Sequence, residues 1–533
     1  MSTAHASPSI ADRILGLRNR TPHHPWLATA DGAWLTVEQT VGAALGVAER
    51  LAREDARPGD RIVIALTNSP AFRLLELAAL LTGMVRVALT PRLHPREVAR
   101  IAADCDARVI CCDPGRVEAF HDAVNERGLC SAVAGFDSLA GFSGVDDIPR
   151  RADDRLLERR GTAPAMLLYT SGTTGAPKGA SVSHRAWLAQ LDLALEQLPS
   201  IGPDDRVLAV APMAHFGGSM ALDAALVGAS TLTMARFSPV DVLDTVLSDG
   251  ITVLPLAPIM VAMLAESAPP ELVARAARQL RAIPYGGSPL AFSRLVTAAR
   301  AFPGLLHQYY GLSETLAPVA ALLATDHDRA VRLFDDGRLA EAEAILSSAG
   351  AVARGTQVRI DPVGEAAGHA VGETSEPGRL SVRSPLVTDG YWGPQGELRP
   401  ATNSEGWFPT GDLGNFDAAG RLHLHGRGDD MIISGGFNVI PAEVESVIRT
   451  VEGVADVAVV GVPDDRWGQR VHATLVLGHP TRPLDQVTAD IEAACRAAMA
   501  AFKRPLSFDV VPELPRTALD KVDRRALRAR LAP

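Results

Sequence analysis

Residues 167–179 read Leu167-Leu168-Tyr169-Thr170-Ser171-Gly172-Thr173-Thr174-Gly175-Ala176-Pro177-Lys178-Gly179. The two leucines and the tyrosine are typical of the end of a buried strand, and a polar run of hydroxyl residues and glycines follows. Glycine allows positive φ and has no Cβ, so successive backbone N–H groups can turn toward an anion. The hydroxyls add donors, and Lys178 adds a mobile positive charge. The composition predicts a phosphate-binding loop, with an ordinary polar hairpin turn as the alternative.

This loop does not have the spacing of a Walker A motif, in which Gly-x-x-x-x-Gly is followed by Lys and by Ser or Thr. It resembles instead, without a gap, the phosphate-binding signature of the adenylate-forming superfamily. That superfamily comprises acyl-CoA synthetases, adenylation domains of peptide synthetases and beetle luciferases. The resemblance implies an enzyme that uses ATP and gives Thr170 a catalytic role. It places these residues against the phosphates: Thr170, Ser171, Gly172, Thr173, Thr174, Gly175 and Lys178.

The overall composition narrows the class of protein. With 533 residues, 47% of them hydrophobic, the chain should form more than one domain with sizeable cores. A net charge of −10 provides no electrostatic footprint for nucleic acid. The N-terminus lacks the apolar segment of a secretory signal, and no apolar run approaches the ~18 residues of a membrane helix. Five cysteines without a Cys-x-x-Cys pair indicate neither a metal site nor a disulfide framework, so we expect a cytoplasmic protein.

Helix-like and strand-like patterns alternate along the first part of the chain, which favours layers of parallel strands and helices. The expected helices span 36–51, 71–81 and 94–104, and the expected strands span 61–66, 85–89, 108–112, 207–211 and 251–256. Further strand patterns near 358–361 and 379–382 predict a β-rich subdomain. The expected fold class is therefore α/β, with a large N-terminal domain of layered α/β subdomains plus a β-rich subdomain. The resemblance adds a small, mobile α+β C-terminal domain.

A second motif, Gln308-Tyr309-Tyr310-Gly311-Leu312-Ser313-Glu314, resembles the other nucleotide-binding segment of the superfamily. An aromatic plane, a hydroxyl and a carboxylate follow one another closely in it. The resemblance implies that Tyr310 stacks on adenine, that Ser313 bonds the α-phosphate and that Glu314 is both catalytic and the ligand of Mg²⁺. Gln308 occupies the position where the family often has an asparagine that reads the adenine amino group.

Three further segments complete the substrate pockets that the resemblance implies. The turn Gly286-Gly287-Ser288 is expected to pass the adenine face through main-chain groups, and Tyr309 and Gly311 extend the nucleotide site. His215 is a further candidate catalytic residue, because it lies where the family has an aromatic residue lining the acyl pocket, and a satisfied, partly buried histidine is the alternative. Small residues at 217–221 suggest room for a bulky acyl group.

Residues 326–350 depart from the family pattern. The charged amphipathic pattern of residues 329–348 predicts a helix interrupted at Gly337, where the family leads us to expect a shorter connection. This segment follows directly on the motif assigned to Mg²⁺ and phosphate. It is therefore either an inert surface excursion or a segment that alters access for ATP or the acid.

The resemblance continues through the last part of the chain. Asp412, which accepts hydrogen bonds only when ionised, matches a contact to two ribose hydroxyls, and Arg427 resembles the second ribose contact. Asp429 matches the hinge at which the small domain of the family rotates. The expected domains are therefore residues 1–428, which bind nucleotide and acid, and residues 429–533.

The small domain carries two more expected contacts. Gly435 and Gly436 are implied to border a pantetheine tunnel, where a thin thiol arm must pass close to the backbone. Lys521, one of only three lysines, resembles the catalytic lysine that reaches the junction of carboxylate and α-phosphate. Asp520 replaces the glycine that usually precedes it. The arginines of residues 524–530 are expected to form a basic, solvated helix.

Motifs of this resemblance cover nearly the whole chain and predict an acyl-CoA ligase. It would convert a carboxylic acid, aryl or otherwise bulky and hydrophobic, with ATP and Mg²⁺ into an acyl-adenylate and transfer the acyl group to coenzyme A. AMP and pyrophosphate are the other products, and a monomer or homodimer is expected. Two alternatives stay open: a free-standing carrier protein as the acceptor, and an enzyme weak in adenylation that acts mainly on acyl-adenylates. A luciferase-like oxidase is more remote.

Overall fold

The computed structural model describes residues 8–137, 157, 161–171, 177–362, 377–393, 396–434, 437–464, 468–478, 483–499, 501–517 and 521–531. The chain forms two compact units. Unit 1 comprises residues 1–357 and 382–408, and unit 2 comprises residues 358–381 and 409–533. The predicted boundary between residues 428 and 429 concerns a hinge, and it stays a prediction. Among the described residues, no helix combines the length and apolar character needed to cross a membrane.

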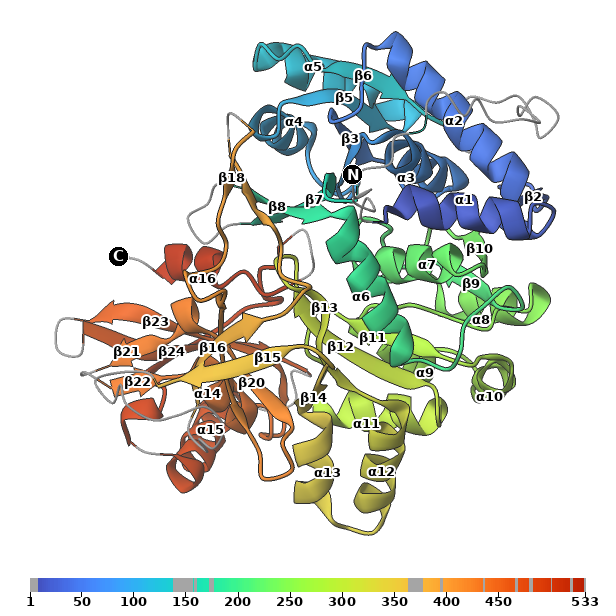
Figure 1. The fold of residues 1–533 in the computed structure, drawn as a ribbon. Helices are drawn as coiled ribbons and strands as arrows, with labels where there is room; N and C mark the ends of the chain where they lie inside the picture. The colour runs from blue at the N-terminus through green and yellow to red at the C-terminus, as the bar shows by residue number, and fades with distance from the viewer. Residues whose placement is uncertain are drawn as a thin grey trace. The chain divides into compact units, whose positions relative to one another are not determined.

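Unit 1 contains a sheet in the order β18-β17-β8-β7-β4-β3-β5-β6 (Figure 1). The pairs β4–β3, β3–β5 and β5–β6 are parallel, because β3, β4 and β5 are each followed by a helix that carries the chain back across the sheet. β7 is parallel to β4 and forms an antiparallel hairpin with β8. The strands are β3 (Arg61–Ala65), β4 (Val85–Ala88), β5 (Ala107–Cys112), β6 (Ala132–Gly135), β7 (Pro164–Ser171), β8 (Pro177–Ser183), β17 (Gly390–Trp392) and β18 (Leu398–Arg399).

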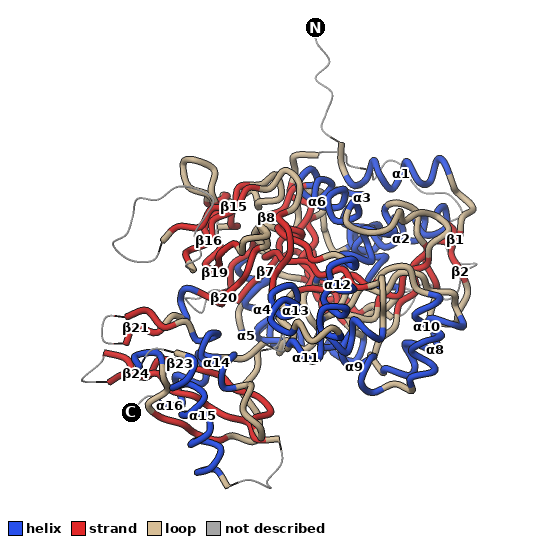
Figure 2. Tube along the Cα trace, turned by 90° about the horizontal axis from the view of Figure 1, so that it is seen from below, coloured by secondary structure: helices blue, strands red, loops and turns tan. Residues whose placement is uncertain are grey.

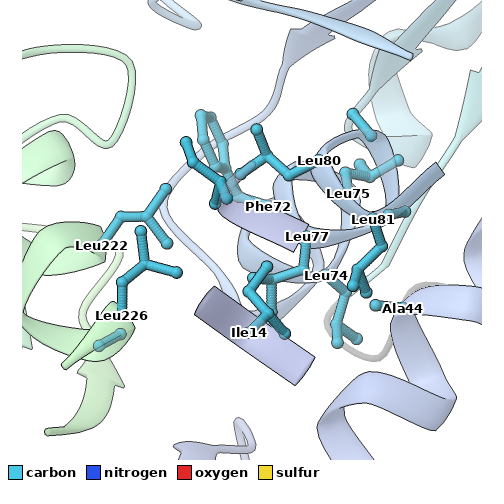
Figure 3. Packing of buried hydrophobic residues seen from close by; sticks show 14 of the residues in the cluster. Ile14, Ala44, Phe72, Leu74, Leu75, Leu77, Leu80, Leu81, Leu222 and Leu226 are labelled. Atoms are coloured by element: carbon cyan, nitrogen blue, oxygen red, sulfur yellow. The ribbon is translucent and has the colours of Figure 1, made fainter. Parts of the chain in front are cut away.

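The predicted helices of this part of the chain are confirmed. Thr36 caps α2 in a capping box with Gln39, which explains why the helix begins there. Every one of the 13 residues of α3 is buried, so α3 is a core helix without a solvent face. The helices are α1 (Ile10–Arg20), α2 (Val37–Arg53), α3 (Pro70–Thr82), α4 (Pro95–Asp104), α5 (Val117–Glu126) and α6 (His184–Glu196). Their core includes Ile14, Phe72, Leu77, Leu222 and Leu226 (Figure 3).

A smaller sheet of unit 1 has the order β2-β1-β10-β9, with β1 (Pro25–Ala28), β2 (Trp34–Thr36), β9 (Arg206–Ala209) and β10 (Ser230–Thr233). The strand expected at 251–256 is wrong: only Val253 and Leu256 form isolated bridges. Pro255 lies between them and has no N–H for a continuous ladder. The helices nearby in the chain are α7 (Phe216–Leu226), α8 (Pro239–Ser248), α9 (Pro258–Ser267) and α10 (Pro270–Gln279).

A third group of strands in unit 1 follows the order β11-β12-β13-β14. Where the family pattern led us to expect a shorter connection, the chain forms a helical hairpin. The hairpin turns at Gly337, whose φ is +76°. Figures 1 and 2 show its helices α12 and α13 side by side and next to α11. Ala330, Leu333, Ala342 and Ile345 are buried in the core, so the hairpin is not a mere surface excursion. The elements are β11 (Ile283–Gly286), α11 (Phe292–Ala301), β12 (Leu306–Leu312), β13 (Leu316–Leu322), α12 (Ala324–Asp335), α13 (Leu339–Leu346) and β14 (Ser348–Val352).

Unit 2 has two groups of strands. The first has the order β20-β19-β16-β15, and the second has the order β22-β21-β24-β23, with β25 parallel to β24. The strands are β15 (Gln357–Asp361), β16 (Gly378–Arg383), β19 (Phe408–Phe416), β20 (Leu422–Arg427), β21 (Ile432–Ser434), β22 (Phe437–Val439), β23 (Val454–Asp464), β24 (Gly468–Leu477) and β25 (Ser507–Val510). The helices are α14 (Pro441–Ile448), α15 (Leu484–Ala498) and α16 (Arg524–Leu531).

Candidate active site

The predicted phosphate loop connects the strands of the β7–β8 hairpin. Thr170 pairs with Lys178 in the ladder, so the two ends of the loop lie opposite each other. Lys178 is exposed, as a cation that meets a dissolved anion must be. Residues 172–176 and the side chains of Thr170 and Ser171 lie outside the described part of the structure. The roles of Thr170, Ser171, Gly172, Thr173, Thr174 and Gly175 therefore stay predictions.

The loop end of this hairpin is anchored by Tyr169. Its hydroxyl donates to Oδ2 of Asp104, the last residue of α4, over 2.6 Å. Its ring lies across Gly179, where an added Cβ would come within 2.9 Å of the ring. Burial raises the pKa of Tyr169, so its phenol stays a protonated donor. Gly179 is thus needed to admit the ring, and the ring fixes the strand on which the loop is mounted.

Tyr391, which the sequence reasoning missed, connects two predicted site residues. Its hydroxyl donates to Oε1 of Glu314 over 3.1 Å, and Nζ of Lys178 lies 5.8 Å from the centroid of its ring. Tyr391 and Glu314 are 77 positions apart in the chain. The Gly390-Tyr391-Trp392 string contains an aromatic pair after a glycine, but this local pattern gives no indication of so distant a contact.

Glu314 offers a carboxylate that suits Mg²⁺. Mg²⁺ is usually held by one or two carboxylates together with substrate phosphates and water, so a single carboxylate near a phosphate loop is a sufficient protein ligand. Among the described residues, no group of three His, Cys, Asp or Glu side chains gathers to form a protein cage for a metal. Glu314 is half-buried, and its main-chain oxygen accepts a hydrogen bond from the N–H of Thr388 over 2.7 Å. The donor set thus fits the predicted ion.

The alternation of strand β12 divides the predicted nucleotide residues between two faces. Gln308, Tyr310 and Ser313 are half-buried. Tyr309 is 2% exposed, donates from its hydroxyl to Ala194 O over 2.9 Å and packs against the core. Its side chain is therefore a packing residue, so a part of Tyr309 in the nucleotide site would be limited to its main chain, and that role stays a prediction. Two residues of one strand that are two positions apart share a face, so Gln308 and Tyr310 remain paired candidates for a base.

The glycines of this region are required by close packing. A Cβ on Gly286 would lie 2.5 Å from Tyr309 O, and one on Gly311 would lie 1.9 Å from Leu316 O. Gly287 has φ +99° and is exposed together with Ser288, whereas Gly286 is buried, and the contact of this turn with adenine stays a prediction.

Both ends of the α12–α13 hairpin reach Gln308. Its Nε2 donates to Ser348 O over 3.2 Å, directly after α13, and its Oε1 lies 3.1 Å from the hydroxyl of Tyr285. That hydroxyl is also 2.7 Å from Nε2 of His327 in α12. Burial lowers the pKa of His327 to about 4, so the ring is neutral at pH 7 and Nδ1 donates to Leu323 O over 2.7 Å. The α12–α13 hairpin, which departs from the family pattern, therefore forms part of the surroundings of Gln308, a predicted adenine contact.

The turn that carries His215 is packed tightly against the preceding residues of the chain. His215 is half-buried at the start of α7. A Cβ on Gly217 would come within 2.5 Å of Ala211, and one on Gly218 would come within 2.2 Å of Met213 Cα. The small residues at these two positions therefore serve core packing, and the inference that they leave room for an acyl group is not supported by their surroundings.

A buried cluster of charges holds the same turn. The carboxylate of Glu76 accepts from Nη1 of Arg73 over 2.8 Å and from Nε of Arg86 over 2.7 Å. Arg86 Nη2 approaches Met213 O at 3.4 Å, and Arg73 Nη2 approaches Gly218 O at 3.5 Å. The two guanidinium groups thus reach main-chain oxygens on either side of His215. Sequence reasoning missed this cluster, although charged residues within the apolar run of α3 were a usable signal.

In unit 2, three predicted residues gather. Asp412 and Arg427 face each other across the β19–β20 pair, and Arg427 Nε lies 3.0 Å from Asp412 Oδ1. Lys521 is exposed as a residue, but protein atoms around its ammonium group lower its pKa by desolvation. The Arg427 charge also lowers this pKa, and the Asp412 carboxylate raises it. The predicted ribose contacts and the predicted catalytic lysine therefore share one electrostatic environment.

The expected basic helix at residues 524–530 forms as α16 with Arg525 and Arg530 exposed, but two of its other arginines form ion pairs. In α16, Arg524 and Arg528 pair with Asp430, and Arg524 also pairs with Glu445. Asp430 directly follows the predicted hinge residue Asp429, so the last helix is tied to the chain beside the hinge. The side chain of Asp429 and residues Gly435, Gly436 and Asp520 lie outside the described part, and their roles stay predictions.

Comparison with known proteins agrees with these motifs. A family model described as AMP-binding enzyme matches residues 18–392, and one described as AMP-binding enzyme C-terminal domain matches residues 443–521. The chain therefore belongs to the AMP-binding enzyme family, within the adenylate-forming superfamily that the sequence motifs predicted.

Similar proteins act on different acids. An indoleacetate–CoA ligase of Aromatoleum aromaticum is 32% identical over 87% of both chains. A fatty acid–[acyl-carrier-protein] ligase, ScoC of Streptomyces coeruleorubidus, is 30% identical over 94% of this chain and 92% of that protein. The solved structure of ATP-bound MatB from Rhodopseudomonas palustris has a TM-score of 0.83 at 25% identity and covers 98% of both chains. The protein is thus an AMP-forming acyl-CoA synthetase, an acid–thiol ligase that uses ATP and CoA.

Proposed function

We propose that the protein activates an aryl or otherwise bulky, hydrophobic carboxylic acid, and that this acid binds beside His215. Phe216 follows His215 and is half-buried, and its ring centroid lies 5.7 Å from that of Tyr309. Phe216 therefore supplies aromatic surface where the resemblance puts the acyl group. The similarity to a ligase named for indoleacetate supports the same class of acid. The glycines at 217 and 218 add no support, because the core requires them.

In the first half-reaction, a carboxylate oxygen of the acid attacks the α-phosphorus of ATP. The bond from that phosphorus to the leaving pyrophosphate oxygen breaks, and an acyl-adenylate forms. All reacting groups are anionic, so their repulsion must be neutralised. We assign this task to Lys178 and Lys521, and Glu314 would hold Mg²⁺, whose charge offsets that of the phosphates when it is bound. The observation that carries the assignment of Lys178 and Glu314 to adenylation is their contact with the same tyrosine.

In the second half-reaction, the thiol sulfur of CoA attacks the acyl carbon. The bond from that carbon to the AMP oxygen breaks, and the thiol proton passes to solvent. The resemblance implies that rotation at Asp429 withdraws Lys521 and brings Gly435 and Gly436 beside the thiol arm. Asp412 and Arg427 would hold the ribose in both steps, since an ionised carboxylate accepts from both hydroxyls.

Mass spectrometry tests this function directly. The purified protein is incubated with ATP, Mg²⁺, CoA and a panel of aromatic, branched and long-chain acids. We expect an acyl-CoA together with AMP, with the highest yield from aromatic or bulky acids. A preference for acetate or other small acids would contradict the proposed acid class. Acyl-CoA formation only from preformed acyl-adenylates would favour the alternative of an enzyme weak in adenylation.

A carrier protein is the second candidate acceptor. The specific observation that favours it is the similarity to ScoC, which is named for an acyl carrier protein over nearly the same length of chain. The test adds a phosphopantetheinylated carrier protein to the same reaction in competition with CoA. Loading of the carrier protein at a rate above that of CoA would establish it as the acceptor.

A further inference from the structure

Tyr391 contacts two residues to which the proposed function gives separate tasks. Its hydroxyl donates to the carboxylate of Glu314, and the ammonium group of Lys178 approaches its ring. Lys178 lies in β8 beside the phosphate loop, whereas Glu314 follows β12 in another sheet of unit 1. One side chain thus links the residue predicted to contact phosphate with the residue predicted to bind the metal.

The register of β17 explains why Tyr391 meets Lys178. β17 runs antiparallel to β8, with Tyr391 opposite Ala180. Lys178 is two residues from Ala180 and therefore projects from the same face of the sheet as Tyr391. Just before β17, Asp389 accepts the N–H of Ser183 over 2.8 Å, which fixes this register from outside the ladder.

The same segment also holds Glu314 at two points. Besides the hydroxyl contact to its side chain, the N–H of Thr388 donates to the main-chain oxygen of Glu314 over 2.7 Å. Thr388 is 5% exposed and hydrogen-bonds from its own hydroxyl to Ser181 O of β8. Thr388 therefore fixes the position of Glu314 relative to β8, the strand that begins at the end of the phosphate loop.

The two contacts of Tyr391 reinforce each other electrostatically. A cation near an aromatic face is attracted by the π electrons. The same positive charge draws electron density from the ring and makes the phenolic O–H a better donor to a carboxylate. The hydroxyl donates to Oε1 of Glu314, and an ionised carboxylate keeps further lone pairs that can accept another positively charged group.

We propose that Tyr391 is a positioning residue for adenylation, which orients the carboxylate of Glu314 through its hydroxyl and the ammonium group of Lys178 through its ring. This inference rests on the proposed function, because it uses the roles assigned there to Glu314 and Lys178. It goes further in assigning the relative placement of those groups to a residue that needs no contact with the substrates.

Two substitutions separate the hydroxyl from the ring. Tyr391→Phe keeps the ring beside Lys178 and removes only the hydrogen bond to Glu314, whereas Tyr391→Leu removes both contacts. Each variant is measured in three ways: by ATP–pyrophosphate exchange, by calorimetric titration of ATP with and without Mg²⁺, and by thioester formation from synthetic acyl-adenylate and CoA. Thr82→Val, which deletes a buried hydroxyl bonded to Ala78 O over 2.7 Å, is the matched control for a purely structural loss.

For Tyr391→Phe we expect about tenfold slower exchange, as for the loss of one hydrogen bond to a charged group. The increase in ATP affinity that Mg²⁺ provides should shrink, while ATP binding without Mg²⁺ should be unchanged. Tyr391→Leu should also weaken ATP binding without Mg²⁺, because Lys178 loses its support. Thioester formation should stay unchanged in both variants, and Thr82→Val should lower the melting temperature without altering the Mg²⁺ effect.

The inference would be overturned by exchange rates of both variants within a factor of about two of the wild type. Equal losses in exchange and thioester formation would also overturn it, since they would indicate a general structural role. The proposed function fails separately, if the unaltered protein shows neither exchange nor thioester formation with any acid. A melting curve of each variant establishes that it is folded before its rates are compared.

Discussion

Replacing Glu76 by glutamine should destabilise unit 1 strongly. The Glu76 carboxylate lies within 2.8 Å of both Arg73 and Arg86, and all three side chains are at most 2% exposed. Glutamine keeps the size of the side chain but removes its charge, which leaves two buried guanidinium groups without the anion between them. Removing one partner of a buried ion pair typically costs about 3–5 kcal/mol. That is a large fraction of the roughly 5–15 kcal/mol that stabilises a folded domain.

Urea unfolding monitored by tryptophan fluorescence measures this loss, because Trp187 is buried next to Arg86. We expect a clearly lower midpoint for Glu76→Gln and a raised KM for the acid, since the arginines support the turn of His215. A second variant, with Arg73→Met, Glu76→Leu and Arg86→Met together, removes the three charges of this cluster at similar volume. It should recover stability, because apolar packing often replaces a buried ion network without loss. An unchanged midpoint for Glu76→Gln would refute the reasoning.

Four other perturbations follow from the structure. Lys521→Ala should slow ATP–pyrophosphate exchange by about 10²–10³-fold and leave thioester formation from acyl-adenylate intact. Asp412→Asn removes a carboxylate that raises the pKa of Lys521, so that pKa should fall further and the alkaline limb of the exchange rate should move to lower pH. Burial lowers the pKa of His184 to about 4, so the unfolded chain binds a proton that the folded chain does not between pH 6.5 and 4. The free energy of unfolding should therefore decrease as the pH is lowered from 6.5 to 4, and it should decrease less in His184→Asn. Gly218→Ala should lower the melting temperature sharply, because its Cβ would meet the main chain of Met213.

Each of these outcomes has a matched control or a contradicting result. Lys503→Ala removes a lysine paired with Glu443 over 2.6 Å and should not separate the two half-reactions. An alkaline limb that stays in place in Asp412→Asn would contradict the assigned electrostatic coupling. Equal acid lability of wild type and His184→Asn would show that other groups govern it. Ser219→Ala, next to Gly218, should melt normally.

Local signals in the sequence predicted much of the fold correctly. Thr36 and Gln39 form the capping box that starts α2, and the alternation of apolar helices and strands predicted the parallel layers. A proline inside an apolar run was the overlooked signal at residues 251–256, because the apolar pattern alone favoured a strand. The interrupted helix at Gly337 was predicted, but its burial in a core depends on distant residues.

The sequence did not predict those contacts of the site that depend on pairing between strands far apart in the chain. Motifs identified Lys178 and Glu314 individually, but the contact of Tyr391 with both depends on long-range packing, including the pairing of β17 with β8. The small residues beside His215 were interpreted as leaving space for an acyl group. A glycine is equally typical of a position where two segments of the chain pack closely, as Gly218 does against Met213. The alternation of β12, which separates Tyr309 from Tyr310, could have been anticipated from the period of two.

The path of the chain through the two units limits how the gene can be divided. Residues 358–381 belong to unit 2, residues 382–408 return to unit 1, and residue 409 begins the rest of unit 2. A break before 358 deprives unit 1 of β17 and Tyr391, and a break after 408 leaves residues 358–381 on the wrong fragment. A single cut therefore cannot yield both units intact, so complementation from two separately expressed fragments would require residues 358–381 to be supplied twice or the gene to be permuted.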